Sequence, residues 1–341
     1  MTAATTIGLD IGSASIRAVE ASRSKGGMII TNVGQALMPH GAVRGGVIQD
    51  DRAVTAALRQ LWGTTRFRSR RVTLGVSNPQ VMVREMQVAN VPHRELHASL
   101  AYQVRDLLPL PVDKTVLDFY PLEDPGRNPN VRGLLIAAPK EAILTAVHAV
   151  ERAGLSVERV DLASFALLRA GSWMDGSVEA IVDIGAQTAS VVVHANGEPI
   201  IVRTIPRGGA EITEAIAGRL EISVNEAENL KRRVGLRPDE ESETAQAIQD
   251  ATRPLLNEIR NSFAYLTSGD RQVQVRRLVL SGGGALLPGL ADSLRAQLNV
   301  EVSYVDALMR VHRLHRRTYE GIDRFRPSAG VSVGLTLGAA A

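Results

Sequence analysis

The chain has 341 residues, of which 45% are hydrophobic and 22% are charged. Lys and Arg number 39 against 36 Asp and Glu, so the net charge is only +3, which argues against a nucleic-acid-binding surface. There is no cysteine, which excludes disulfides and thiolate metal sites and fits a reducing compartment. We find no signal peptide and no apolar run near the ~20 residues that span a bilayer, and the length suits two lobes better than one core.

Residues 7–20 predict a β-hairpin with a polar turn. Apolar residues alternate up to Asp10, the chain turns at Gly12-Ser13, and the alternation resumes around Arg17. Backbone N–H groups at such a turn can converge on an anion, and glycine lets the backbone approach it closely. An Asp beside a phosphate usually serves Mg²⁺, directly or through water. An ordinary tight turn also favours Gly and Ser, so this hairpin alone leaves both interpretations open.

The rest of the first half predicts an α/β lobe with an insertion. Up to residue 80 we expect a third strand, a helix beginning at Asp50 or Asp51, and a fourth strand at 70–76. Residues 81–156 follow a β-α-β-β-α order that the second half lacks, and we interpret them as an inserted subdomain; a continuation of the first lobe is the alternative. A strand at 157–161 returns to the first lobe.

Residues 180–193 repeat the first hairpin, with Asp183 and Gly185 in the places of Asp10 and Gly12. Each copy continues into a third strand, a pair of glycines, a helix and a basic-flanked strand. Internal repetition fixes architecture, so we expect two α/β lobes whose Asp-x-Gly turns face each other across a cleft. One polyphosphate–Mg²⁺ unit could then be held from both sides. A chance duplication of strand-turn-strand is the alternative.

Two further features of the second half could line this cleft. Glu228 and Lys231 lie three residues apart on one face of a short helix, and an exposed ion pair is the competing interpretation. A buried strand runs into Gly282, Gly283 and Gly284, which would let a flat group lie against bare backbone at the mouth of a helix. A crowded strand-to-helix turn would also explain these glycines.

The C-terminal part is less informative. The stretch 310–326 is rich in Arg and His and predicts a solvated surface in preference to a lipid head-group site. Residues 328–337 predict a final helix packed on the second lobe. We therefore expect four parts: a first lobe (1–80 and 157–175), an insert (81–156), a second lobe (176–209 and 276–341) and a helical subdomain of that lobe (210–275).

The two Asp-x-Gly hairpins, the Ser-Gly-Gly-Gly turn and the matching lobes resemble the actin-like ATPase superfamily, which shares a duplicated, ribonuclease H-like two-lobe α/β fold with sugar kinases and DnaK-type chaperones. Within it the chain is most similar to the type IV pilus assembly protein PilM family. The similarity is carried by residues 7–20, 107–111, 116–120, 182–188 and 280–284. The place of the insert also resembles that in the cell-division protein FtsA.

The resemblance implies bound ATP and Mg²⁺, and it assigns a role to each candidate residue. Asp10 and Asp183 would hold Mg²⁺ through water. Phosphate contacts would come from the two turns, namely from Gly12, Ser13 and Arg17 and from Asp183, Gly185 and Thr188. The nucleoside would rest on Gly282, Gly283 and Gly284, with Glu228 and Lys231 near adenine and ribose. Arg17 stands where many relatives have lysine, and it keeps the charge but binds with a different fork geometry.

Hydrolysis needs a group that orients the attacking water. Gln187 on the second turn is the only amide placed to do so, and we therefore expect tight nucleotide binding with slow or negligible turnover.

The resemblance further implies a cytoplasmic scaffold at the inner face of the membrane, capable of self-association. Its groove would take the N-terminal cytoplasmic segment of PilN, which would link the pilus motor to the inner-membrane alignment complex.

Two other functions remain open. An FtsA-like division protein would polymerise at the membrane, but the C-terminal residues lack the basic face of an amphipathic anchor. A small-molecule kinase of the sugar-kinase branch would need a carboxylate as base, and the insert carboxylates Asp106, Asp113 and Asp118 stand in no recognisable motif.

Overall fold

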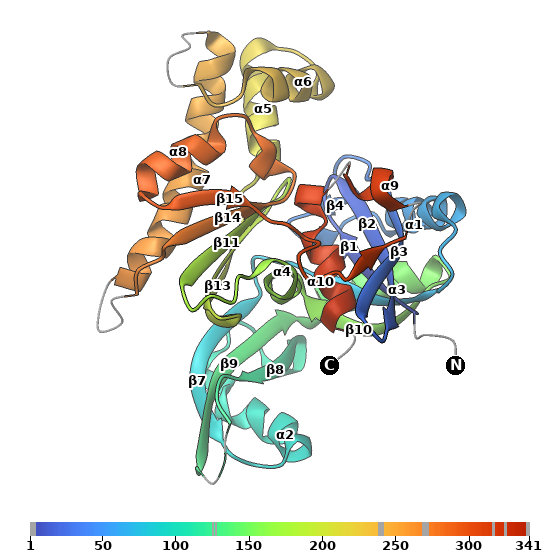
Figure 1. Cartoon of the computed structure of the whole chain (residues 1–341), viewed down its shortest axis with the longest axis vertical. Helices are drawn as coiled ribbons and strands as arrows, with labels where there is room; N and C mark the ends of the chain where they lie inside the picture. The colour runs from blue at the N-terminus through green and yellow to red at the C-terminus, as the bar shows by residue number, and fades with distance from the viewer. Residues whose placement is uncertain are drawn as a thin grey trace.

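The computed structural model describes residues 5–124, 126, 128–237, 242–267, 273–315, 318–323 and 326–338. Two mixed sheets form two lobes, and a smaller third sheet lies beside their junction (Figure 1). The strands are β1 (Thr5–Ile11), β2 (Ser15–Ser24), β3 (Gly27–Leu37), β4 (Val43–Arg44), β5 (Val47–Ile48), β6 (Arg71–Val76), β7 (Met82–Ala89), β8 (Thr115–Pro121), β9 (Asn130–Pro139), β10 (Ser156–Leu162), β11 (Val178–Ile184), β12 (Ala189–Ala195), β13 (Glu198–Ile205), β14 (Arg277–Ser281), β15 (Glu301–Tyr304) and β16 (Arg313–Leu314). The α-helices are α1 (Asp51–Thr65), α2 (His93–Gln103), α3 (Lys140–Arg152), α4 (Ala163–Gly171), α5 (Gly209–Leu220), α6 (Val224–Val234), α7 (Glu243–Thr267), α8 (Leu290–Leu298), α9 (Tyr319–Asp323) and α10 (Gly330–Gly338).

The two large sheets repeat one topology. The first has the order β10-β6-β1-β2-β3-β16, and the second has the order β13-β12-β11-β14-β15. In each, three antiparallel strands (β3-β2-β1 and β13-β12-β11) are followed by two parallel ones (β6-β10 and β14-β15). The first sheet has β16 as a sixth strand, parallel to β3. The registers also correspond, because Asp10 pairs with Arg17 across the first hairpin as Asp183 pairs with Ser190 across the second. The duplication expected from the two Asp-x-Gly hairpins is therefore confirmed.

Side-chain alternation along β1 explains how the first sheet is covered on both faces. Ile7 and Leu9 are fully buried in a cluster with residues of α1 and α3. Gly8 points the other way, toward α10, where an added Cβ would lie 2.1 Å from the Ser332 carbonyl oxygen. The absence of a side chain at residue 8 therefore allows α10 to approach the sheet closely.

The helices α4 and α10 lie between the two sheets. Their apolar residues Leu167 and Leu335 share one buried cluster with Ile181 and Val279 of the second sheet. The outer face of the second sheet is covered by α5, α7 and α8, which contribute to a separate large cluster. The two lobes thus have their own cores and share a third one along α4 and α10.

The third sheet belongs to the insert and has the antiparallel order β7-β9-β8, with α2 packed against it. The β-α-β-β-α order expected for 81–156 is observed in this segment. The last helix, α3, packs differently from the other insert elements, because its residues Ala149 and Val150 are buried in the core of the first lobe. The boundary of the insert at residue 156 remains a prediction.

The C-terminal segment packs on the first lobe as well as on the second. We predicted that the last helix would pack on the second lobe, and Val331 and Leu335 of α10 do share a buried cluster with residues of the second sheet. However, α10 also packs on β1 and α4, and β16 pairs with β3 of the first sheet. These first-lobe contacts were not predicted, because α10 approaches β1 and β6 over the bare backbone at Gly8 and Gly75, which are distant in sequence. Arg316, Arg317, Arg324 and Phe325 of the basic stretch lie outside the described residues.

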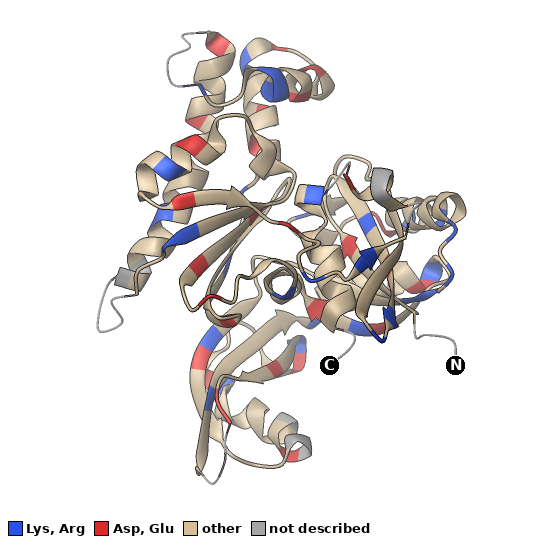
Figure 2. Cartoon of the chain, viewed as in Figure 1, with Lys and Arg blue, Asp and Glu red and all other residues tan. Residues whose placement is uncertain are grey.

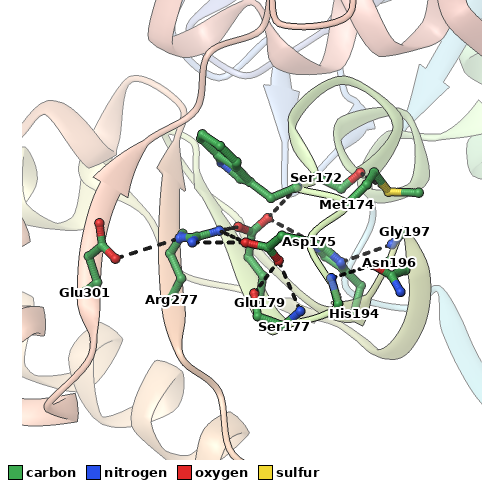
Figure 3. Close-up of polar contacts among 12 residues, drawn as sticks. Ser172, Met174, Asp175, Ser177, Glu179, His194, Asn196, Gly197, Arg277 and Glu301 are labelled. Atoms are coloured by element: carbon green, nitrogen blue, oxygen red, sulfur yellow. Dashed lines mark hydrogen bonds and ion pairs between the residues drawn. The ribbon is translucent and has the colours of Figure 1, made fainter.

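A buried carboxylate anchors the crossing from the first lobe to the second (Figure 3). Glu179 Oε1 lies 3.0 Å from His194 Nε2 and accepts a hydrogen bond from the Trp173 N–H at 3.2 Å. Its Oε2 lies 3.3 Å from Arg277 Nη1. The Gly197 N–H donates to His194 Nδ1 at 3.3 Å, so Nε2 carries the ring hydrogen and donates to Glu179. These bonds fix the crossing segment to the second sheet.

Charged side chains of both signs are interspersed along both lobes and the insert (Figure 2). Among the described residues, no helix is both long enough and apolar enough to cross a membrane.

The close contact between α4 and α10 makes a specific prediction. A Cβ at Gly334 would lie 1.7 Å from the Ala166 carbonyl oxygen, so Gly334→Ala should separate the helices and lower the free energy of unfolding by about 1–3 kcal/mol. Gly218→Ala is the matched control, because the new Cβ on α5 meets no atom within 4 Å and alanine favours helix by up to about 1 kcal/mol. Urea unfolding of both variants measures the difference; equal stabilities would contradict the packing described.

Candidate functional site

A cavity of about 550 Å³ opens between the two lobes. This volume lies within the range of small-molecule sites in proteins. Every residue that the sequence analysis proposed as a ligand of nucleotide or metal, or for catalysis, lies on its wall: Asp10, Gly12, Ser13, Arg17, Asp183, Gly185, Gln187, Thr188, Glu228, Lys231, Gly282, Gly283 and Gly284.

The first wall is the turn between β1 and β2. The Gly12 N–H donates to the Ser15 carbonyl at 3.0 Å, which closes the turn. Arg17 Nη1 lies 3.4 Å from Asp10 Oδ2, and the two side chains are only 17% and 19% exposed. Arg17 Nε is buried and donates to no atom within the described part of the chain. A buried donor without an acceptor is unfavourable, and here it lines a cavity.

The second wall is the equivalent turn between β11 and β12. The Gly185 N–H donates to the Thr188 carbonyl at 2.9 Å, as Gly12 does to Ser15. This turn is also tied to the start of α5, because Gly209 N–H donates to the Gly185 carbonyl at 3.0 Å and Ala210 N–H donates to the Ala186 carbonyl at 2.7 Å. The turn is therefore held rigidly against a helix N-terminus, which favours negative charge.

The two aspartates of the cavity are costly to ionise. Burial raises the pKa of Asp10, and the Asp183 charge raises it further, whereas Arg17 lowers it. Burial also raises the pKa of Asp183, and this effect outweighs the hydrogen bond with Ser281 and the charge of Arg17, which both lower it. Two desolvated carboxylates of like charge favour either a proton or a further cation between them.

The donor set fits Mg²⁺ better than a metal held by protein side chains alone. The described residues contain no group of three or more His, Cys, Asp or Glu side chains that could hold a metal. Mg²⁺ usually keeps several waters and binds through one or two carboxylates together with phosphate oxygens. Asp10 and Asp183 therefore fit a hydrated Mg²⁺ that a phosphate also coordinates.

Glu228 and Lys231 form a partly buried pair, not the exposed ion pair that was the alternative. Lys231 Nζ lies 2.5 Å from Glu228 Oε2 and donates to the Gly209 carbonyl at 2.9 Å and to Thr213 Oγ1 at 2.7 Å. Burial lowers the pKa of Lys231. Burial alone would raise the pKa of Glu228. The hydrogen bonds that Glu228 accepts from Lys231, Thr213 and Arg232 outweigh burial, so the pKa of Glu228 is lowered. The pair joins α6 to α5 at the rim of the cavity.

The three glycines after β14 have different roles. Gly282 has a φ of +87°, and an added Cβ would lie 2.4 Å from the Ile184 carbonyl oxygen. A Cβ at Gly284 would lie 2.6 Å from Ile184 Cγ2. Both positions therefore fit the crowded-turn interpretation. Gly283 differs, because its Cβ would meet nothing within 4 Å, and it presents open backbone to the cavity.

Gln187 makes a contact that the sequence did not suggest. Its Oε1 accepts a hydrogen bond from the Gly45 N–H at 2.9 Å, across the cleft from the second lobe to the first. The side chain that we proposed for orienting water is thus already engaged by the backbone of the opposite lobe.

Several residues on the cavity wall were not predicted as site residues, among them Ser77, Ser164, Thr213, Asn225 and Arg232. Ser164, near the start of α4, has a buried hydroxyl with no hydrogen-bond partner in the described segments. None of these residues belongs to a sequence motif that predicts ligand binding, and only the fold brings them to the cavity.

The duplicated lobes with two facing Asp-x-Gly turns define the actin-like ATPase fold. MreB5 of Spiroplasma citri, in its structure bound to ADP, has this fold: it is 14% identical with a TM-score of 0.57, and the match covers 98% of this chain and 95% of that chain. The fold class expected from the sequence is confirmed.

The model of the family described as "Type IV pilus assembly protein PilM" matches residues 8–340, and the chain belongs to this family. A chain of the PilM-PilN type IV pilus biogenesis complex is 26% identical, with a TM-score of 0.87 and coverage of 98% of both chains. The cell division protein FtsA of Streptococcus pneumoniae serotype 2 (strain D39 / NCTC 7466) is 26% identical over 341 residues, which cover 86% of this chain and 74% of FtsA.

The raised pKa of Asp183 predicts a pH-dependent stability. The folded state keeps the proton at pH values where the unfolded state, with a pKa near 3.8, has lost it, so this group lowers stability as the pH rises through that range. Asp183→Asn removes the free-energy cost of ionising this buried carboxyl and should therefore raise the melting temperature of the nucleotide-free protein at pH 7. The expected rise is about 2 °C for each kcal/mol of that cost. Calorimetric scans from pH 3.5 to 7 test this; a gain that persists unchanged below the unfolded-state pKa would contradict it.

Proposed function

We propose that the chain is an ATP-binding scaffold of the type IV pilus assembly machinery. Family membership supports the pilus role. The nucleotide role is carried by one observation: two turns of matching register, each with an aspartate of raised pKa, face one cavity together with Arg17. A solved structure of the same fold, MreB5 of Spiroplasma citri, is bound to ADP and adds support for a nucleotide in this cleft.

In this proposal each wall contributes backbone N–H groups to the triphosphate. Gly12 and Ser13 of the first turn and Gly185 and Thr188 of the second bind the phosphates, and Arg17 adds a positive charge with a free Nε–H. Mg²⁺, when bound, neutralises phosphate charge, and Asp10 and Asp183 hold it through water.

The nucleoside end of the cavity is formed by other elements. Gly283 offers open backbone to the base. Glu228 and Lys231 lie at the rim formed by α5 and α6, where their polar groups reach the ribose and the adenine. Gly282 and Gly284 shape the turn against β11.

We further propose that hydrolysis is slow or negligible. Orienting the attacking water requires a free hydrogen-bonding group near the terminal phosphate. The Gln187 oxygen accepts from the Gly45 N–H, and this bond holds the side chain against the opposite lobe instead of leaving it free to turn toward a water. The nucleotide then acts mainly by holding the lobes together.

The partner we propose is the N-terminal cytoplasmic segment of PilN, which would attach the chain at the inner face of the membrane and connect the motor with the alignment complex. A related chain forms the PilM-PilN complex. The insert offers a suitable surface, because β8 is an edge strand with Val116 and Tyr120 41% and 42% exposed. The Tyr120 ring lies 5.6 Å from that of Phe165 on α4. An extended peptide binds an edge strand through main-chain hydrogen bonds and side-chain pockets.

The nucleotide proposal predicts that the protein binds Mg–ATP and that Arg17→Ala weakens this binding by about 10- to 100-fold, because hydrogen bonds to charged groups contribute about 1.5–3 kcal/mol. Isothermal titration calorimetry with Mg–ATP measures both constants. Arg52→Ala, which removes an exposed arginine outside the cavity, should bind as the wild type does. Absence of any heat with the wild-type protein would refute the proposal.

The partner proposal predicts that a synthetic PilN N-terminal segment binds with a 1:1 stoichiometry and that Tyr120→Ala weakens it about tenfold, since a buried aromatic contributes a large apolar area. Tyr304→Ala is the control, because Tyr304 is exposed to a similar degree (45%) but lies on β15 of the second sheet, not in the insert. Fluorescence anisotropy of the labelled peptide measures each affinity. Equal losses at both tyrosines would place the peptide elsewhere.

A further inference from the structure

One hydrogen bond joins the two lobes across the mouth of the cavity. The Gly45 N–H, at the tip of the β4–β5 hairpin in the first lobe, donates to Gln187 Oε1 of the second-lobe turn at 2.9 Å. A second cross-cleft contact, between His40 and Glu214, is 3.9 Å long with side chains 71% and 54% exposed. Exposed pairs of this kind contribute little, so the Gly45–Gln187 bond is the stronger contact.

The donor is built into a rigid hairpin. Val43 pairs with Ile48 and Arg44 with Val47, which leaves Gly45 and Gly46 as a two-residue loop. Both have positive φ, +55° and +76°, as the type I′ turn of a tight hairpin requires. The N–H of the first loop residue is not used by the ladder in such a turn, so it is free to donate across the cleft.

The hairpin also has little room to move. A Cβ at Gly46 would lie 1.6 Å from the Ser77 carbonyl oxygen, so the hairpin tip rests directly on the loop that follows β6. On the other lobe, the turn that carries Gln187 is held by the hydrogen bonds of Gly209 and Ala210 to Gly185 and Ala186. The bond therefore joins two preorganised loops, and a rotation of one lobe against the other must break it.

From this geometry we propose that Gln187 is a latch residue: its amide oxygen holds the lobes closed, and breaking its bond to Gly45 limits the release of bound nucleotide. The release step rests on the proposed function, whereas the effect on lobe closure does not. Gln187 is thus a positioning residue that controls how long the cleft stays closed, in place of the catalytic role that the sequence suggested.

The first arm of the test measures lobe closure without nucleotide. The chain has no cysteine, so Gln60→Cys on α1 and Ala296→Cys on α8, both exposed, introduce a unique pair of spin labels for pulsed electron–electron resonance. Gln187→Ala and Gln187→Met remove the acceptor oxygen and should shift the distribution toward longer interlobe distances. Gln187→Glu keeps an acceptor and should retain the wild-type distribution, and so should Gln80→Ala, an exposed control. Unchanged distances in Gln187→Ala and Gln187→Met would overturn the proposal.

The second arm measures release of N-methylanthraniloyl-ATP by stopped flow, in excess unlabelled ATP. The two variants without an acceptor should release it about fivefold faster than the wild type, which corresponds to about 1 kcal/mol, while Gln80→Ala matches the wild type. Equal release rates would refute the latch. Failure of the wild type to bind the probe would refute the proposed nucleotide function instead, and the distance measurement would still decide whether the latch exists. Thermal melts of every variant confirm that it is folded.

Discussion

Two desolvated aspartates facing each other across the cleft set the electrostatic demand that the rest of the site must meet. Burial raises the pKa of both Asp10 and Asp183, and Arg17 works in the opposite direction on both. One guanidinium is shared by the two carboxylates, so it does not balance both charges when both groups are ionised. Ionising both aspartates in the nucleotide-free cleft therefore costs stability, which other parts of the fold must offset.

Apolar packing supplies that stability away from the cleft. Each lobe has its own core, and a third cluster along α4 and α10 joins the two sheets. Close backbone contact at Gly8 and Gly334 makes this junction tight. The crossing segments are also linked, because Arg310 Nη2 donates to the Ser172 carbonyl at 2.8 Å, beside the Glu179 network in Figure 3. The lobes are thus joined tightly along α4, α10 and the crossing segment.

Local patterns were sufficient to predict the duplicated framework. The Asp-x-Gly turns, the alternation of strands and the Ser-Gly-Gly-Gly segment are features of neighbouring residues, and they placed both aspartates, Arg17 and Gly283 around one cavity. Features that depend on distant contacts were not predicted. The pairing of β16 with β3 joins segments more than 200 residues apart in the sequence, and the packing of α10 on β1 depends on Gly8, which is equally distant. The partner of Gln187 is 142 residues away and is a backbone N–H, which no sequence pattern marks.

The position of the β4–β5 hairpin connects the cleft with the insert. Gly46 and Ser77 line both the main cavity and a second cavity of about 30 Å³, whose wall includes Pro139 and Ala142 at the junction of β9 and α3. Asn78, next to Ser77, has a buried Nδ2 without a partner in the described segments, and the chain enters the insert sheet four residues later at β7. A Cβ at Gly46 would lie 1.6 Å from the Ser77 carbonyl oxygen, so the hairpin tip rests on this loop with no room for a side chain. The hairpin that lines the cleft and the loop that leads into the insert are therefore in direct contact in the first lobe.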